Sequence, residues 1–188
     1  MVSAALVAAI FEQHHMKKGH SIHFVDHWAR VLENGRKLAP LTGARLDVVE
    51  LFSVFHDAGR QNDGYDDRHG ARGSLLARDL RGILFDLDHA GFHLLVEACD
   101  RHTEGETDAD VTIQTCWDAD RLDLGRAGYI PKPAKLCTSA ARDSQMIEWA
   151  HNRSTRFVVP GLVLSEWGLC KDRSEIFVKC RSDLPDPL

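Results

Sequence analysis

Residues 54–70 read VFHDAGRQNDGYDDRHG and join a long apolar segment to a loop rich in ionisable side chains. The segment over residues 46–55 is apolar on nearly every side of a helix, which is typical of a helix at the centre of a domain. His56 and Asp57 follow it directly, so both polar side chains are expected to be buried. A buried charge is costly unless something compensates it. The stretch therefore predicts a polar site at the end of a central helix.

Helical patterns dominate the rest of the chain and predict an all-α fold. The spacing of apolar residues predicts an amphipathic first helix near the N-terminus and a second helix over residues 22–38, ending before Pro40. Thr42 is expected to cap the central helix, and Asp88 is expected to cap a later one. The remaining helical patterns cover residues 69–84, 88–102, 110–125 and 134–150.

The composition is that of an ordinary globular chain. Of its 188 residues, 44% are hydrophobic and 27% are charged, which is enough apolar material for one compact core. We expect a helical domain over residues 1–152. Residues 153–188 are expected to form a less regular extension, of short strands or irregular structure, packed on the same domain.

The charge pattern argues against polymeric nucleic acid as a partner. The net charge is -5, and the few aromatic residues are not interleaved with basic runs. A small phosphorylated substrate is still compatible, because a few local arginines can bind it. No segment is apolar over the length that a membrane crossing needs, so no membrane is expected. The five cysteines form no CxxC pair and are odd in number, which favours a cytoplasmic location.

A second buried carboxylate is predicted on the helix over residues 110–125. Asp120 shares one helix face with apolar residues, and His27 lies in a comparable setting beside Trp28. Two imidazoles and two carboxylates on separate buried helices can offset one another by converging on a divalent cation. The sequence therefore predicts a metal site formed by His27, His56, Asp57 and Asp120.

These residues, in this order, resemble the HD-domain superfamily of metal-dependent phosphohydrolases. The flanking stretches HWARVLENGRKLA (27–39), FHDAGRQNDG (55–64) and CWDADRLDLGRAG (116–128) are also similar to helices of that superfamily. The resemblance covers roughly residues 20–150. It implies a helical bundle around a central metal site, and hydrolysis of a nucleotide or another small phosphoester by metal-activated water.

The resemblance also implies a role for each matching residue. His27 matches the first metal ligand of the superfamily, and His56 and Asp57 match its His-Asp doublet. Asp120 matches the last ligand, with Asp118 as the alternative for that position. Imidazole and carboxylate ligands suit Mn, Fe, Co, Ni or Zn, and Mg is compatible with them.

Two further histidines are candidates for a second ion or for contacts that support the ligands. His102 shares a helix face with core residues, and His23 lies four residues before His27 on the same face of a helix. If both His69 and His102 bind metal, the centre becomes binuclear. The short gap between Asp57 and His69 favours a single ion.

The loop after the doublet supplies candidates for catalysis. His69 is the favoured general acid or base, with Asp63 and Arg60 as the other catalytic candidates. Arg72 and Arg121 are expected to bind the substrate phosphate.

Two other functions remain open at this stage. Bacterial HD 5′-deoxynucleotidases commonly carry a catalytic glutamate three residues after the doublet, where this chain has Arg60. We therefore do not assign their mechanism or substrate to this chain. One rival is a regulatory HD module that binds a metal or a nucleotide without turnover. The other is a diiron HD oxygenase, which would need both His69 and His102 as ligands. The exact substrate, the native metal and the oligomeric state are not predicted.

Overall fold

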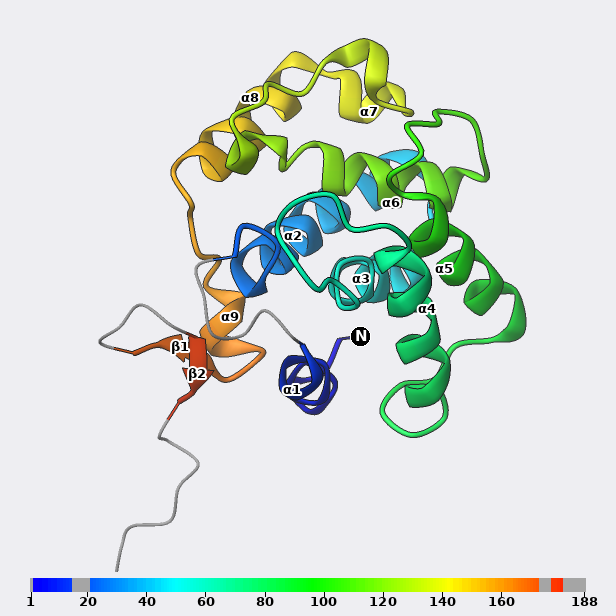
Figure 1. Ribbon diagram of the computed structural model, residues 1–188. Helices are drawn as coiled ribbons and strands as arrows, with labels where there is room; N and C mark the ends of the chain where they lie inside the picture. Colours follow the sequence, from blue (N-terminus) through cyan, green and yellow to red (C-terminus); the bar gives the residue numbers. More distant parts are fainter. Residues whose placement is uncertain (1, 15–20, 173–176, 181–188) are drawn as a thin grey trace, which may run out of the picture.

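The computed structural model describes residues 2–14, 21–172 and 177–180. Over these residues the chain is mostly helical, which confirms the expected all-α fold (Figure 1). The elements, in chain order, are α1 (Ala4–Gln13), α2 (Val25–Thr42), α3 (Leu46–Phe55), α4 (His69–Leu80), α5 (His89–Arg101), α6 (Val111–Arg121), the 3-10 turns η1 (Leu124–Ala127) and η2 (Pro133–Lys135), α7 (Ser139–Arg142), α8 (Ser144–Thr155), α9 (Leu162–Ser165), β1 (Leu169–Lys171) and β2 (Phe177–Lys179).

Helices α2 and α3 lie at the centre, and the other helices surround them (Figure 1). Helix α3 contacts α2, α4, α5 and α6, and α2 also contacts α6, α7 and α8. Residues 48–55 of α3 are all buried, as their apolar pattern predicts. Trp28 from α2, Phe52 from α3 and Trp117 from α6 are fully buried in the core between these helices. The polar doublet that follows α3 therefore lies deep in the molecule.

Helix α2 continues two residues beyond Pro40, although the sequence predicted that it ends before this proline. Pro40 lies in the last turn, where the end of the helix is held by other groups. The hydroxyl of Thr42 donates to carbonyl groups of that turn, and Gly43, with φ of 78°, donates its N–H to the carbonyl of Ala39. The prediction that Thr42 caps α3 was wrong: it ends α2, and α3 begins after Arg45.

Two glycines allow α4 to pack closely against α3 and α5. A Cβ atom on Gly73 would overlap the carbonyl oxygen of Phe55, and one on Gly70 would overlap the carbonyl oxygen of Cys99. Only glycine permits this approach of one backbone to another. The close packing carries His69, the first residue of α4, to the ends of α3 and α5.

The helix predicted over residues 134–150 is broken into η2, α7 and α8. The buried carboxylate of Asp118 accepts hydrogen bonds from the backbone N–H groups of Cys137 and Thr138, and Thr138 is extended rather than helical. Thr138 then caps α7, and Asp143 caps α8, through their side-chain oxygens. Two new helix starts therefore replace one continuous helix.

The C-terminal part contains α9 and the strands β1 and β2, which pair antiparallel. Trp167, Leu169 and Phe177 from this part are buried in the same core as the central helices. Among the described residues, no helix is both long enough and apolar enough to cross a membrane.

Candidate metal centre

Five helices bring six ionisable side chains together at their ends. His27 lies in the first turn of α2, His69 begins α4, and Asp120 lies in the last turn of α6. His56 and Asp57 directly follow α3, and His102 directly follows α5. The site residues that are less than 10% exposed are His27, His56, Asp57, His69 and His102. The side chain of Asp120 is 14% exposed.

In each of the four histidines, the Nδ1 atom lies within hydrogen-bonding distance of an acceptor oxygen. His56 Nδ1 lies 3.1 Å from the carbonyl oxygen of Phe52, and the Nδ1 atoms of His69 and His102 each lie 2.7 Å from a backbone carbonyl oxygen. His27 Nδ1 lies 2.8 Å from Oδ2 of Asp123. A carbonyl oxygen only accepts, so these Nδ1 atoms carry the proton and the Nε2 atoms of neutral rings keep a lone pair.

The four Nε2 atoms then face one another in two pairs. His27 Nε2 lies 3.0 Å from His56 Nε2, and His69 Nε2 lies 3.0 Å from His102 Nε2. With both Nδ1 atoms protonated, neither Nε2 atom of a neutral pair has a hydrogen to donate. Such a contact is unfavourable on its own, and a cation between the two lone pairs makes it favourable. This arrangement is typical of metal-ligating histidines, whose other ring nitrogen donates to a carbonyl or a carboxylate.

The carboxylate of Asp57 lies between the two histidine pairs. Its Oδ2 atom is 3.4 Å from His27 Nε2 and 3.6 Å from His56 Nε2. Its Oδ1 atom is 3.1 Å from His69 Nε2 and 3.7 Å from His102 Nε2. One oxygen thus faces each pair, so Asp57 could contribute a ligand atom to either group of histidines.

The donor set fits divalent cations. Ligands about 2.1 Å from a common ion, at about 90–110° to one another, lie roughly 3.0–3.4 Å apart. His27 Nε2 and Oδ1 of Asp120 are 3.4 Å apart, and this buried Oδ1 atom accepts no hydrogen bond from the described residues. Three overlapping groups could each hold an ion: His27, His56 and Asp120; Asp57, His69 and His102; and His23, His27 and Asp57.

Burial and neighbouring charges favour the protonation states that metal binding requires at His56, Asp57 and Asp120. Burial lowers the pKa of His56 to about 3, so its ring is neutral at ordinary pH. Burial opposes ionisation of Asp57, but His56 and the hydrogen bond with His23 lower its pKa below the usual range. The pKa of Asp120 is also lowered, because Arg126 and the histidines outweigh the effect of burial. At His102 burial lowers the pKa, but the nearby carboxylate of Asp57 outweighs it, and the pKa is raised.

The structure brings together the four residues predicted as ligands and several of the other candidates. His69 and His102 form the second histidine pair, and Nδ1 of His23 lies 2.8 Å from Oδ2 of Asp57. Arg60 donates from Nε to Oδ1 of Asp57 at 2.9 Å. Arg121 lines the pocket beside the centre.

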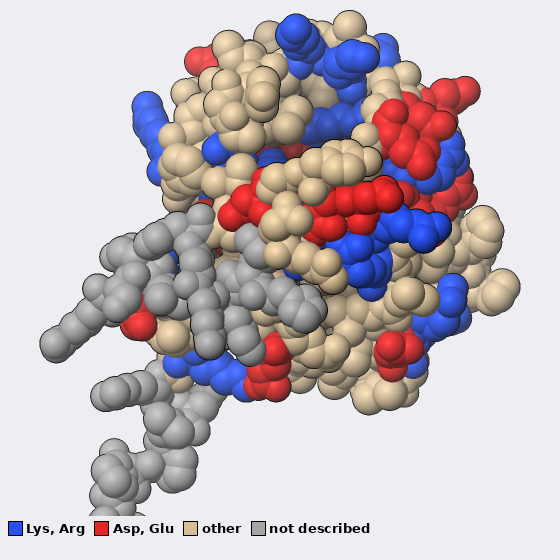
Figure 2. All heavy atoms as spheres, viewed as in Figure 1, with Lys and Arg blue, Asp and Glu red and all other residues tan. Residues whose placement is uncertain are grey.

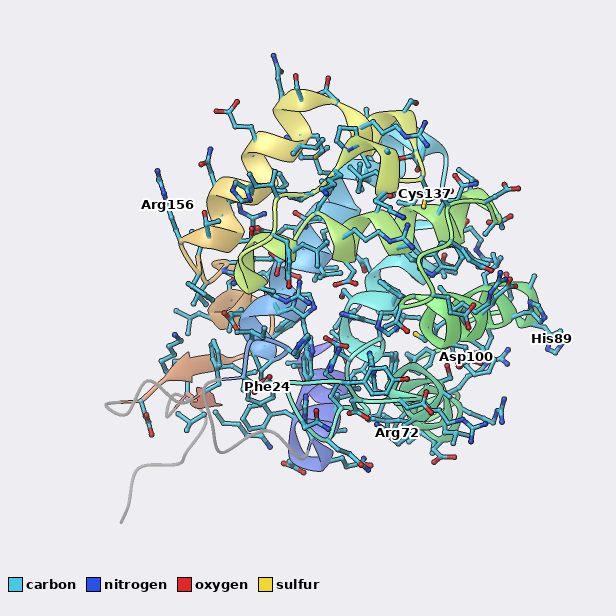
Figure 3. All side chains as sticks on the ribbon, turned by 45° about the horizontal axis from the view of Figure 1, so that its top comes forward. Phe24, Arg72, His89, Asp100, Cys137 and Arg156 are labelled. Carbon is cyan, nitrogen blue, oxygen red and sulfur yellow. The ribbon has the colours of Figure 1, made fainter. Side chains whose placement is uncertain are left out.

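Three other candidates lie outside this group. Asp118 is buried, but it accepts hydrogen bonds from Cys137 and Thr138. Asp63 is exposed and accepts a hydrogen bond from the hydroxyl of Ser21. Arg72, labelled in Figure 3, donates to the carbonyl oxygens of residues 59 and 67 and pairs with the carboxylate of residue 66. Their hydrogen bonds direct these side chains to structural contacts.

Sequence reasoning missed two residues that support the centre. Asp123 accepts from Nδ1 of His27 and also binds the buried guanidinium of Arg30, whose Nε lies 2.8 Å from Oδ1. Arg126, in η1, lies with its Nη2 atom 3.5 Å from Oδ1 of Asp120. The sequence after Asp120 could have indicated both residues. Asp123 stands between two leucines, and Arg126 follows within one turn.

A pocket of about 270 Å³ opens beside the centre. Its lining includes the candidate ligands Asp57, His102 and Asp120, and the arginines Arg60, Arg121 and Arg126. On the molecular face shown in Figure 2, acidic and basic side chains are intermixed. The pocket thus combines candidate metal ligands with cationic groups that could bind an anion.

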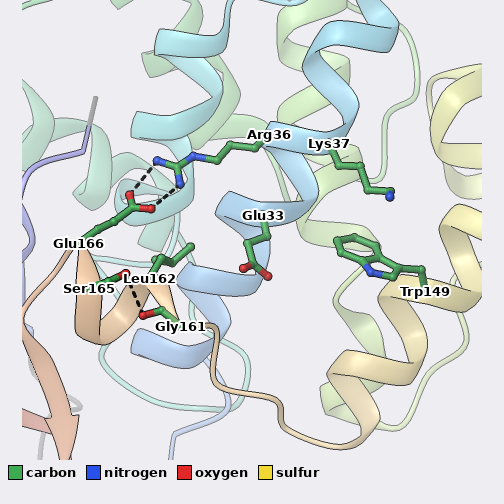
Figure 4. Close-up of a pocket in the computed structure, with 8 residues that line it drawn as sticks. All are labelled: Glu33, Arg36, Lys37, Trp149, Gly161, Leu162, Ser165 and Glu166. Carbon is green, nitrogen blue, oxygen red and sulfur yellow. Dashed lines mark hydrogen bonds and ion pairs between the residues drawn. The ribbon is translucent and has the colours of Figure 1, made fainter.

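A larger hollow of about 640 Å³ lies between α2, α8 and α9 (Figure 4). Its charged groups already have partners: Arg36 binds both carboxylate oxygens of Glu166, and Nζ of Lys37 lies over the Trp149 ring, 4.8 Å from its centre. These pairings stabilise the contact between the helices. The smaller pocket, with its histidines and carboxylates, is therefore the better candidate for chemistry.

Comparison with known proteins adds no relative: no protein-family model, no curated protein and no solved structure matches the chain. The candidate site therefore rests on the positions and chemistry of its own residues.

Proposed function

We propose that this protein is a metal-dependent phosphohydrolase of the HD type, acting on a nucleotide or another small phosphoester. The observation that carries the proposal is the pair of Nε2–Nε2 contacts at 3.0 Å, on either side of Asp57, next to a pocket lined by arginines. The order of His27, the doublet and Asp120 along an all-helical chain supports the assignment to the HD superfamily.

The residues that would hold metal divide into two groups sharing Asp57. His27, His56, Asp57 and Asp120 would hold one ion, and Asp57, His69 and His102 would hold a second. A divalent cation in such a site acidifies water and offsets charge on phosphoryl oxygens. We assign His69 to the second group rather than to proton transfer, because its Nε2 atom lies 3.1 Å from Asp57 and 3.0 Å from His102.

The surrounding residues hold the ligands in position. Asp123 and Arg30 fix the ring of His27 in the tautomer that directs Nε2 into the centre. Arg60 holds Oδ1 of Asp57 and lines the pocket. The shell around the centre thus pre-organises the ligands and excludes most solvent, which strengthens electrostatic interactions inside it.

A second candidate function follows from the second histidine pair. If His69 and His102 hold an iron ion, the centre has the ligand number that a diiron oxygenase requires. The arginines in the pocket favour a phosphorylated substrate, and for this reason we place the phosphohydrolase first.

Turnover of a chromogenic phosphate ester tests the proposed function. Protein loaded in turn with Mn, Fe, Co, Ni or Zn is expected to hydrolyse p-nitrophenyl phosphate or its diester, with the rate lost on chelation and restored by metal. Because Arg78 is exposed on α4, the variant Arg78→Gln should keep the wild-type rate. Full metal occupancy without hydrolysis across a broad panel of phosphoesters would reject the proposal and favour a regulatory module. Oxygen consumption by the iron form would favour the oxygenase.

A further inference from the structure

We propose that Arg121 and Arg126 together bind the phosphoryl group of the substrate, and that the preferred substrate is a phosphomonoester in its dianionic form. This inference rests on the proposed function and specifies its substrate class. It depends on two buried guanidinium groups that line the pocket next to the candidate metal ligands.

Arg121 is held rigidly but keeps one donor group without an acceptor. Its Nη1 atom donates to the carbonyl oxygen of Lys135 at 3.0 Å and to Sγ of Cys137 at 3.3 Å. Cys137, labelled in Figure 3, has its pKa raised to about 12 by burial and by Asp118, so the thiol does not neutralise the arginine. Arg121 is 9% exposed, and its buried Nη2 atom has no hydrogen-bond partner among the described residues.

Arg126 approaches the same pocket from η1. Its Nε atom donates to the carbonyl oxygen of Ile22 at 2.9 Å, and its Nη2 atom lies 3.5 Å from Oδ1 of Asp120. Arg126 is 7% exposed, and its buried Nη1 atom makes no hydrogen bond within the described chain. The nearest carboxylate oxygen, Oδ2 of Asp123, forms an ion pair with this atom but at 3.8 Å is too distant for a hydrogen bond. Its backbone and carboxylate contacts thus fix the guanidinium while leaving a donor atom available.

Two buried guanidinium donors without a hydrogen-bond acceptor, on residues that line the same pocket, are unusual. A buried donor that finds no acceptor costs about 1–3 kcal/mol, and more when it is charged. An anion with several oxygens satisfies both arginines at once, and guanidinium groups bind phosphate oxygens in a planar fork. The arrangement therefore indicates a phosphoryl site beside the metal ligands.

The charge of the pocket distinguishes a monoester from a diester. The lining contains the carboxylates of Asp57 and Asp120 against the guanidinium groups of Arg60, Arg121 and Arg126, so one positive charge is in excess before any cation binds. Each divalent cation adds two more. A phosphomonoester with its second pKa near 6 is mainly a dianion at neutral pH, whereas a diester carries one charge. With a divalent cation bound, the dianion offsets more of the excess positive charge than the monoanion does.

Binding of two small anions to the full-length chain tests the inference. Inorganic phosphate, a dianion at mildly alkaline pH, and dimethyl phosphate, a monoanion, are titrated calorimetrically into metal-loaded and metal-free protein. The proteins are the wild type, Arg121→Gln, Arg126→Gln and the exposed control Arg78→Gln, with metal content measured for each. We expect phosphate affinity to fall about ten- to a hundredfold in the two pocket variants while metal content is kept. The control should bind phosphate as the wild type does.

The outcomes separate this inference from the proposed function. Wild-type phosphate affinity in both pocket variants, or equal wild-type affinity for phosphate and dimethyl phosphate, would overturn the inference and leave the metal centre intact. A wild-type chain that takes up no metal would contradict the proposed function. The metal-free titrations then decide the phosphoryl site by comparing phosphate affinity between the wild type and the two pocket variants. If Arg126→Gln does not fold, Arg121→Gln alone decides it.

Discussion

Asp57→Asn is expected to lower metal affinity more than a hundredfold, which is the largest functional effect of a single substitution in this chain. Asparagine keeps the shape of the side chain but removes the charge that faces both histidine pairs. It also leaves the buried guanidinium of Arg60 without its carboxylate partner. Loss of a residue that merely supports a ligand costs about 10–100-fold in metal affinity, so loss of a shared ligand should cost more. Metal titration of the purified variant measures the change.

The control for this variant is Asp118→Ala. Asp118 is also a buried carboxylate, but its partners are backbone and hydroxyl groups of residues 137–138, outside the metal centre. We expect this variant to melt at a lower temperature, because buried N–H groups lose their acceptor, and to keep its metal affinity. Two results would contradict the placement of Asp57 in the centre: wild-type metal affinity in Asp57→Asn, or a loss of metal affinity in Asp118→Ala that Asp57→Asn does not show.

Gly73→Ala is expected to destabilise the protein by roughly 3 kcal/mol, at the upper end of the usual range for overpacking. The added Cβ atom would overlap the carbonyl oxygen of Phe55, a backbone atom that cannot move without shifting the end of α3. For a chain of this length, that loss lowers Tm by about 6–12 °C. Because His56 and Asp57 directly follow Phe55, metal affinity should fall as well.

The matched control is Gly161→Ala. Gly161 has ordinary right-handed backbone angles, and a Cβ atom there would have no neighbour within 4 Å. Its effect on stability should stay within about 0.5 kcal/mol, as for most surface substitutions. Calorimetric melting of both variants makes the comparison. Equal melting temperatures for the two would show that α4 does not depend on a close backbone approach to α3.

The helical core was predictable because its signals are local. The apolar pattern of residues 46–55 marks a buried helix whatever surrounds it, and Asp88 caps α5 through a hydrogen bond to a residue three positions away. The break in the helix expected over residues 134–150 depends instead on Asp118, which lies on another helix and takes two backbone N–H groups there. Sequence periodicity does not report such a long-range acceptor.

The same distinction holds for the site. Asp57 and Asp120 stood out because each follows or interrupts an apolar helix face, and the structure places both beside His27. The tautomer of His27 depends on Asp123, which comes from a different helix end. The short interval between Asp57 and His69 favoured one ion, but the loop between them returns His69 to within 3.1 Å of Asp57. The possibility of a second ion therefore follows from tertiary structure.

The metal content of the wild-type chain tests the central claim most directly. The protein is purified without a metal-affinity tag, reconstituted separately with Mn, Fe, Co, Ni and Zn, and analysed by elemental mass spectrometry against protein concentration. We predict two equivalents per chain with at least one of these metals, falling to one in His102→Ala because only the second group loses a ligand. No bound metal under any of these conditions would contradict the account.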